Sequence, residues 1–235
     1  MTETIAALFA EQTAANFLTT TPTNGGFIGA DIERLLAERA TVIYRDVADT
    51  SYYGALIQLK QQNFAILNTA PPLRQRYYHA AHTLWDLVAT SYQQNVTASD
   101  AFTAAIMLPA RQTTVTWQRL QRKADSPAFA LLQLADQTAM PYHVVAHRLA
   151  DLQLLAIDDL LSRTEAEWLA WRTAHHPFPS ALDRPLHMVH FDRLTTDVMR
   201  YLDHDQLTTS DAAQLLRNAN PDLAQRYSTH RSRSN

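Results

Sequence analysis

The chain has 235 residues, 46% of them hydrophobic and 18% charged, with a net charge of −3 and no cysteine. This composition predicts a globular protein of one or two domains. The absence of cysteine excludes disulfides and cysteine metal sites and favours a cytoplasmic location. The small negative net charge gives no overall electric field that favours nucleic acid. No apolar run reaches the ~18–20 residues that a membrane span needs, so no membrane association is expected.

The first half of the chain combines two helices with a group of strands. Helical periodicity covers residues 2–18, and a second helix is expected at 30–40 after a break containing glycine and proline. Three runs rich in β-branched and aromatic residues follow, at 41–47, 52–59 and 64–68. We expect these runs to form a small three-stranded sheet, antiparallel or mixed.

From about residue 74 the pattern is mainly helical. Prolines at 71 and 72 end the strand region, because proline cannot donate to a β-ladder. Helices are expected at 74–92, 98–108, 113–122, 127–137, 141–153, 164–174, 189–203 and 208–217. The basic stretch 226–235 is expected to be a disordered tail. The order of helix, sheet and helices predicts an α+β fold with a mostly helical second half.

The stretch RQRYYHAAHTLWDLV, residues 74–88, carries half of a zinc-protease signature. In the full signature, His-Glu-x-x-His, two imidazoles one helical turn apart hold the metal and the glutamate accepts a proton from the bound water. Here His79, His82, Thr83 and Asp86 share one face of the predicted helix. Thr83 occupies the general-base position but has no carboxylate.

Two interpretations of this helix face are open. His79, His82 and Asp86 could supply three ligands to zinc or manganese, although the usual base would still be missing. The other interpretation is that they are ordinary polar side chains on a partly buried face.

A longer stretch, FAILNTAPPLRQRYYHAAHTLWDLV at residues 64–88, resembles the strand, loop and active-site helix of the ImmA/IrrE family of metallopeptidases. The matching positions, with one extra residue after Arg76, are Asn68, Arg74, Arg76, Tyr77, Ala81, His82 and Leu84. The segment SDAFTAAIMLP at 99–109 resembles a second family segment with an aromatic residue, small residues and a terminal proline. Residues 131–155 and 191–216 resemble the family's helix-turn-helix-like segment and its C-terminal helix pair.

The resemblance implies a zincin-like domain over residues 1–125, with the small sheet and an active-site helix. A helical domain over 126–235, with a helix-turn-helix-like segment and the basic tail, is implied to follow. The departures fall on the catalytic positions. His82 keeps the first ligand, but Thr83 replaces the base, Asp86 replaces the second histidine, and the segment NVTASD at 95–100 lacks the family's glutamate ligand.

This pattern implies a catalytically inactive, metallopeptidase-like regulatory protein without a cofactor. Active relatives are implied to cleave a helix-turn-helix repressor of mobile-element or stress genes, so the expected partner is a protein such as that repressor. Asn68, Arg74, Arg76 and Tyr77 are the candidates for the cleft or partner contact. One alternative is a metal-dependent endopeptidase that uses the rearranged site with a further ligand, such as Asp100 or a loop histidine.

The other alternative is a DNA-binding regulator acting through residues 127–153. This segment has few basic residues besides Arg148, whereas DNA recognition needs a basic face, so direct nucleic-acid binding is not expected. His143 and His147 have a ligand-like i, i+4 spacing, but no third partner is near in sequence, so a packed helix face is the favoured interpretation. The tail arginines, which could touch phosphates or belong to a solvated terminus, are Arg226, Arg231 and Arg233.

A histidine-rich, proline-containing segment spans residues 173–191. Its candidate metal ligands are His175, His176, His187 and His190. The competing interpretation is a surface connector between helices.

Overall fold

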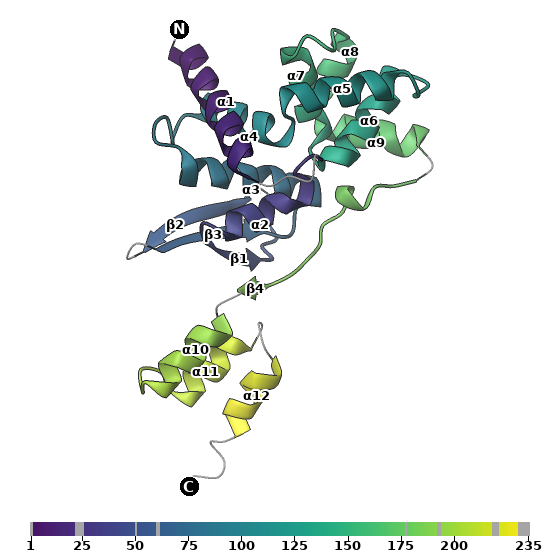
Figure 1. The fold of residues 1–235 in the computed structure, drawn as a ribbon. Coiled ribbons are helices and arrows are strands. Elements are labelled where there is room, and N and C mark those ends of the chain that lie inside the picture. Colours follow the sequence, from purple (N-terminus) through teal and green to yellow (C-terminus); the bar gives the residue numbers. More distant parts are fainter. Residues whose placement is uncertain are drawn as a thin grey trace. The chain divides into compact units, whose positions relative to one another are not determined.

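The computed structural model describes residues 2–21, 26–49, 51–59, 62–176, 178–191, 194–217 and 221–229. Within these ranges the fold is α+β and predominantly helical, as predicted (Figure 1). The chain divides into two compact units, Met1–Arg39 with Pro71–Leu186, and Ala40–Ala70 with His187–Asn235. The boundary expected between residues 125 and 126 lies inside the first unit, and a division of folding domains at that point stays a prediction.

The first unit is helical. Its elements are α1 (Thr2–Thr20), the 3₁₀ helix η1 (Gly29–Asp31), α2 (Ile32–Ala37), α3 (Leu73–Val88), α4 (Val96–Met107), α5 (Ala110–Gln121), α6 (Pro127–Thr138), α7 (Tyr142–Asp151), α8 (Asp158–Leu161), α9 (Glu165–His175) and the 3₁₀ helix η2 (Ala181–Asp183). Helix α1 packs along α4, and α3 packs against both α4 and α2. All of the helices predicted for this unit are present; α8, which has only four residues, was not predicted because it is too short to show a period.

The helix boundaries follow from local chemistry. Helices α3, α5 and α7 each begin directly after a proline with extended ψ, at Pro72, Pro109 and Pro141. Helix α4 begins at Asn95, whose side chain accepts a 2.8 Å hydrogen bond from the amide of Ala98. These caps fix where α3 and α4 start, and therefore which of their side chains face each other.

The α1–α3–α4 contact is built from aromatic and aliphatic side chains. Trp85 on α3 and Phe102 on α4 are fully buried, with ring centroids 5.3 Å apart. Phe9 of α1 contacts the edge of Trp85 at 6.4 Å. Burial of side chains of this size contributes about 1.5–3 kcal/mol each, so the helix pair that carries the candidate site is held firmly.

The second unit contains a mixed sheet with strand order β2-β3-β1-β4. Its strands are β1 (Thr41–Arg45), β2 (Gly54–Leu59), β3 (Gln62–Asn68) and β4 (His190–Phe191). Strand β1 is parallel to β3, and β2 is antiparallel to β3. The three predicted strands are confirmed. The helix predicted from residue 189 was wrong at its start, because His190 and Phe191 pair with Tyr44 and Ile43 as a fourth strand and the helix begins at Leu194.

Glycine is required at one position of this sheet. Gly54 has φ +155°, and a Cβ atom placed there would lie 2.1 Å from the carbonyl oxygen of Ile66. The close approach of the β2 and β3 backbones at this point therefore excludes every other residue type.

The chain ends in three helices, α10 (Leu194–Asp203), α11 (Thr209–Leu216) and α12 (Pro221–Thr229). They share a small core of Val198, Ala212, Leu216 and Ala224. Helix α12 was not predicted; the expectation of a disordered tail was wrong for residues 226–229, which complete α12, and residues 230–235 lie outside the described residues. None of the described helices combines the length and apolar composition needed to cross a bilayer.

Candidate functional site

His82 lies between two residues of the neighbouring helix α4. Its Nδ1 atom is 2.7 Å from Ser99 Oγ, and its Nε2 atom is 3.2 Å from Asp100 Oδ1. The second contact is close but lacks hydrogen-bond geometry, which leaves Nε2 buried without a hydrogen bond. Tyr78 stacks edge-on against His82 at 4.4 Å and donates a 2.9 Å hydrogen bond to the same Asp100 oxygen. Both ring nitrogens of His82 are thus in contact with α4.

The charges around His82 favour an ionised carboxylate. The contact with His82 is the main cause that lowers the pKa of Asp100, and the hydrogen bond from Tyr78 lowers it further. Burial acts in the opposite direction. Burial and the Asp100 charge raise the pKa of Tyr78. Tyr78 therefore remains a neutral hydrogen-bond donor beside a charged Asp100.

His79, one turn before His82, is partly buried and neutral. Burial, together with repulsion from His82, lowers the pKa of His79 to about 3. Its Nε2 atom lies 3.0 Å from the side-chain nitrogen of Gln75. At neutral pH this ring carries no charge.

The other two positions of the signature are Thr83 and Asp86. The hydroxyl of Thr83 donates a 2.9 Å hydrogen bond to the backbone oxygen of His79. Asp86 is an exposed residue. The part of its carboxylate that is shielded from water raises its pKa, and the attraction of His82 opposes this effect. Among the described residues, no group of three or more His, Asp or Glu side chains has a geometry that could hold a metal ion. His79, His82 and Asp86 all lie on α3, and a metal site formed by them stays a prediction.

Arg74 and Arg76, expected to contribute to the cleft, are only 2% and 4% exposed. Arg74 donates to Asp183 at 2.6 Å and to the carbonyl oxygens of Ala135 and Met140 at 2.7 and 3.1 Å. Arg76 donates a 2.6 Å hydrogen bond to Glu33 on α2. Both guanidinium groups therefore connect α3 to distant parts of the first unit.

Asn68 and Tyr77 are also buried, at 1% and 8% exposure. The Asn68 amide accepts from the amide of Val47 and donates to the oxygens of Val47, Asp49 and Tyr52. It therefore organises the loop between β1 and β2. The structure gives all four expected cleft residues internal contacts, and contact with a partner stays a prediction for them.

A second buried arginine completes the network around Arg74. Arg172 on α9 donates to Asp136 at 2.9 Å and to the hydroxyl of Tyr142 at 2.9 Å, and Tyr142 in turn donates to Asp183. Two guanidinium groups thus face two carboxylates and one phenol. This network was not predicted from the sequence, because its members come from α3, α6, α7, α9 and η2 and no local pattern connects them.

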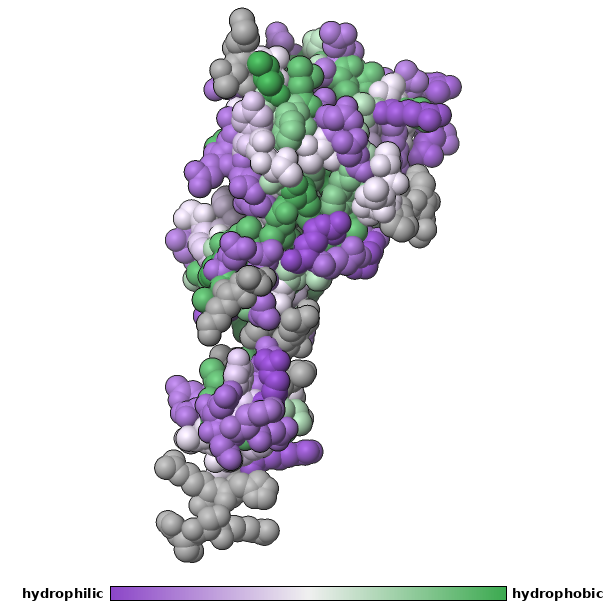
Figure 2. Space-filling view, turned by 60° about the vertical axis from the view of Figure 1, so that its left-hand side comes forward, coloured by the Kyte–Doolittle hydropathy of each residue, from purple (hydrophilic) through white to green (hydrophobic). Residues whose placement is uncertain are grey.

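A pocket of about 620 Å³ opens between α1, α4 and α7, on the side of Tyr78 and Asp100. Its lining includes apolar side chains, those of Ala104 of α4, Leu8 of α1 and Val144 of α7. In the space-filling view, apolar side chains reach the surface among the helices of the first unit and are bordered by hydrophilic ones (Figure 2). The volume lies within the range of ligand sites, about 300–1,000 Å³.

The histidines of α7 belong to this pocket. His143 and His147 both line it, as does Arg148. His143 Nδ1 lies 2.9 Å from Glu165, and Arg148 is 5% exposed and paired with Glu11 of α1. The predicted i, i+4 spacing therefore places two histidines at a pocket wall, where the described residues offer no third ligand.

The four histidines of residues 173–191 are distributed over both units. His175 stacks on Trp171 at 4.5 Å, and His176 Nδ1 lies 3.0 Å from the oxygen of Phe178. His187 Nδ1 is 2.9 Å from Asp46, and His190 belongs to β4. Each has its own local contact, and the described part of the chain shows no metal-binding group among them.

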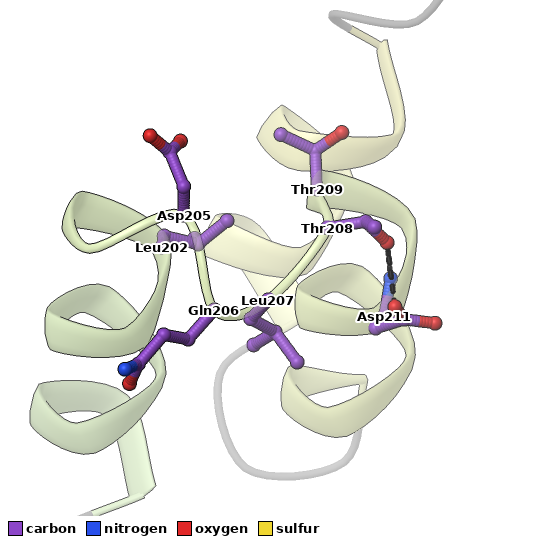
Figure 3. Close-up of a pocket in the computed structure, with 7 residues that line it drawn as sticks. All are labelled: Leu202, Asp205, Gln206, Leu207, Thr208, Thr209 and Asp211. Carbon is purple, nitrogen blue, oxygen red and sulfur yellow. Dashed lines mark hydrogen bonds between the residues drawn. The ribbon is translucent and has the colours of Figure 1, made fainter.

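A second pocket, of about 500 Å³, lies at the turn between α10 and α11 (Figure 3). Thr208 accepts a 3.1 Å hydrogen bond from the amide of Asp211 and donates one of 2.6 Å to its carboxylate. This is the cap of α11, and the other labelled side chains, among them Asp205, Gln206 and Leu207, point in different directions. The turn offers no converging polar groups, so we place the candidate site at the α1–α4–α7 pocket.

Comparisons of the chain with models of protein families, with curated proteins and with solved structures found no match.

Proposed function

We propose that this chain is a metallopeptidase-like regulatory protein that binds a protein partner and does not hydrolyse it. The observation that carries the proposal is the arrangement on α3. Thr83 stands at the general-base position with its hydroxyl bonded to the backbone of His79, and both nitrogens of His82 contact α4. The weakly basic hydroxyl of Thr83 cannot replace a carboxylate as the base of zinc hydrolysis, and loss of the base alone typically costs about 10²–10⁴-fold in rate.

The pocket between α1, α4 and α7 supports the binding half of the proposal. Leu8 is 63% exposed beside Ala104 and Val144, so the structure presents apolar surface that these helices do not cover themselves. Apolar surface rimmed by polar groups is typical of sites for protein partners. The resemblance to ImmA/IrrE peptidases supports a helix-turn-helix repressor as the partner, because such a repressor is the implied substrate of active relatives.

The experiment combines a binding assay with a cleavage assay. The purified chain is mixed with helix-turn-helix repressors encoded beside it, in the presence of zinc or manganese. We expect a stoichiometric complex by size-exclusion chromatography and calorimetry, and intact repressor by mass spectrometry. Leu8→Ser should weaken the complex, whereas Val115→Ser, at a position of matching 61% exposure on α5 outside the pocket, should not.

Two results would contradict the proposal. Metal-dependent cleavage of the repressor would show an active peptidase. A complex equally sensitive to the Leu8 and Val115 variants, or no complex with any of these repressors, would remove the proposed binding site.

A metal-dependent endopeptidase remains the second candidate, on one specific observation. His79 is neutral, the form that binds metal, and Asp100, which could serve as a further ligand, lies 3.2 Å from His82. The DNA-binding alternative has less support, since Arg148, the single arginine of α7, is buried and paired with Glu11 rather than presented to a groove.

A further inference from the structure

The pocket between α1, α4 and α7 has an excess of negative charge. Three carboxylates line it, those of Glu11, Asp100 and Asp151, against one arginine, Arg148. That arginine is buried and already paired with Glu11. The exposed carboxylates of Asp100 and Asp151 therefore have no arginine or lysine to balance them among the residues that line the pocket.

The carboxylate of Asp100 is held in place through one of its two oxygens. The hydrogen bond from Tyr78 and the contact with His82 both involve Oδ1. Within the described residues, Oδ2 accepts no hydrogen bond, and the side chain is 52% exposed. A carboxylate fixed through one oxygen offers the other to an ammonium or guanidinium group, with the ring of Tyr78 lining the same pocket.

Apolar side chains line the same pocket as these charges. Leu8, Ala104 and Val144 supply them from three different helices. A ligand that matches both features carries an aliphatic side chain beside a positive one. An amphipathic helix with lysine or arginine at the edge of its apolar face has this arrangement.

We propose that this pocket binds a basic amphipathic segment of the partner protein. A lysine or arginine of that segment pairs with Asp100 beside Tyr78, and an apolar side chain of the same segment covers Leu8, Ala104 and Val144. The inference rests on the proposed function, because it takes the occupant to be part of a protein.

The test uses three synthetic peptides and the full chain. One peptide is an amphipathic helix of leucine and lysine, the second replaces lysine by glutamate, and the third replaces leucine by serine. We expect saturable binding of the leucine–lysine peptide at one site, and binding of the other two peptides at least about tenfold weaker. Binding of the leucine–glutamate peptide as tight as that of the leucine–lysine peptide would overturn the inference in favour of an acidic partner.

Variants locate the binding site. Asp100→Asn should weaken binding of the leucine–lysine peptide by about three- to tenfold at low salt, and less as salt rises. Because Asp100 also contacts His82, Asp151→Asn is a second variant that keeps that contact, and we expect it to weaken binding as well. Asp31→Asn, at a carboxylate 71% exposed and outside the pocket, is the matched control and should leave affinity unchanged.

Equal effects of the Asp31 and Asp100 variants would overturn the inference, since binding would then follow net charge alone. Absence of saturable binding up to about 1 mM peptide would also overturn it. The outcome for the proposed function can be distinguished from the outcome for this inference. If the repressor complex forms and is weakened by Leu8→Ser but not by Asp100→Asn or Asp151→Asn, the function stands and the basic segment is wrong.

Discussion

Arg74 Nε on α3 donates a 2.6 Å hydrogen bond to Asp183, 109 positions later in the chain, and the two side chains are 2% and 8% exposed. The Arg74 guanidinium also lies 4.4 Å from the ring of Tyr142. Although burial opposes it, hydrogen bonds from Arg172 and Arg74 hold the pKa of Asp136 below its usual value. A residue that resembles part of a peptidase motif thus acts as the centre of a buried ion network.

Replacement of Arg74 by methionine should strongly destabilise the chain. It leaves the Asp183 carboxylate and two carbonyl oxygens without their buried partner, which costs about 3–5 kcal/mol. Urea unfolding followed by circular dichroism measures the loss. Arg34→Met is the control, because Arg34 is 51% exposed in its ion pairs and should contribute less than about 1 kcal/mol. If Arg74→Met lowered the free energy of unfolding as little as Arg34→Met does, the cleft role that the sequence predicts for Arg74 would be favoured instead.

Asn68→Ala should destabilise the β1–β2 loop and the sheet. Its amide satisfies backbone groups of Val47, Asp49 and Tyr52, and leaving buried groups unpaired costs about 1–3 kcal/mol. Hydrogen exchange of residues 47–52 reads out the loop directly. Asn16→Ala, at an exposed side chain whose one hydrogen bond among the described residues comes from Gln12, should have little effect. Unchanged exchange in the Asn68 variant would show that water replaces the amide without cost.

Gly54→Ala should disrupt the pairing of β2 with β3. The added Cβ would meet the carbonyl oxygen of Ile66 at 2.1 Å, and the positive φ adds about 1–3 kcal/mol of strain. Thermal unfolding compares it with Gly26→Ala, where nothing lies within 4 Å of the new atom. Equal stability of the two variants would contradict the register of this hairpin.

His79 should make the chain less stable in mild acid. The unfolded chain binds this proton near pH 6.5, whereas burial lowers the pKa of the folded His79 to about 3, so the unfolded state binds more protons between these values. The stability is fully present above about pH 6.5 and is lost as pH falls, by at most about 1.4 kcal/mol per pH unit. Urea unfolding between neutral and mildly acidic pH gives the free energy of unfolding at each pH. This free energy should fall less steeply with decreasing pH in His79→Gln than in the unchanged chain. Identical slopes would place His79 in solvent.

Metal content distinguishes the two candidate functions. Elemental analysis of tag-free protein, reloaded with zinc or manganese, should find well below one ion per chain, because no three potential ligands converge among the described residues. His82→Ala should not change the value. About one ion per chain, lost in His82→Ala, would instead favour the endopeptidase.

The local elements of this fold could be predicted from the sequence. Apolar residues at helical spacing and β-branched runs predicted nearly all helices and the three longer strands, and the prolines at 72, 109 and 141 mark where helices start. These features depend on residues close in sequence, where backbone preference and side-chain period act directly. The shared helix face of His79, His82 and Asp86 was predictable for the same reason.

What the tertiary structure alone decided are contacts between segments far apart in the chain. His190 becomes a strand residue because Tyr44 is available to pair with it. Arg74 becomes a core residue because Asp183, Asp136 and Tyr142 surround it. The pocket also exists only where α1, α4 and α7 meet. Helical and strand periods specify which face of an element is buried, but the partner that covers that face depends on packing among all the elements together.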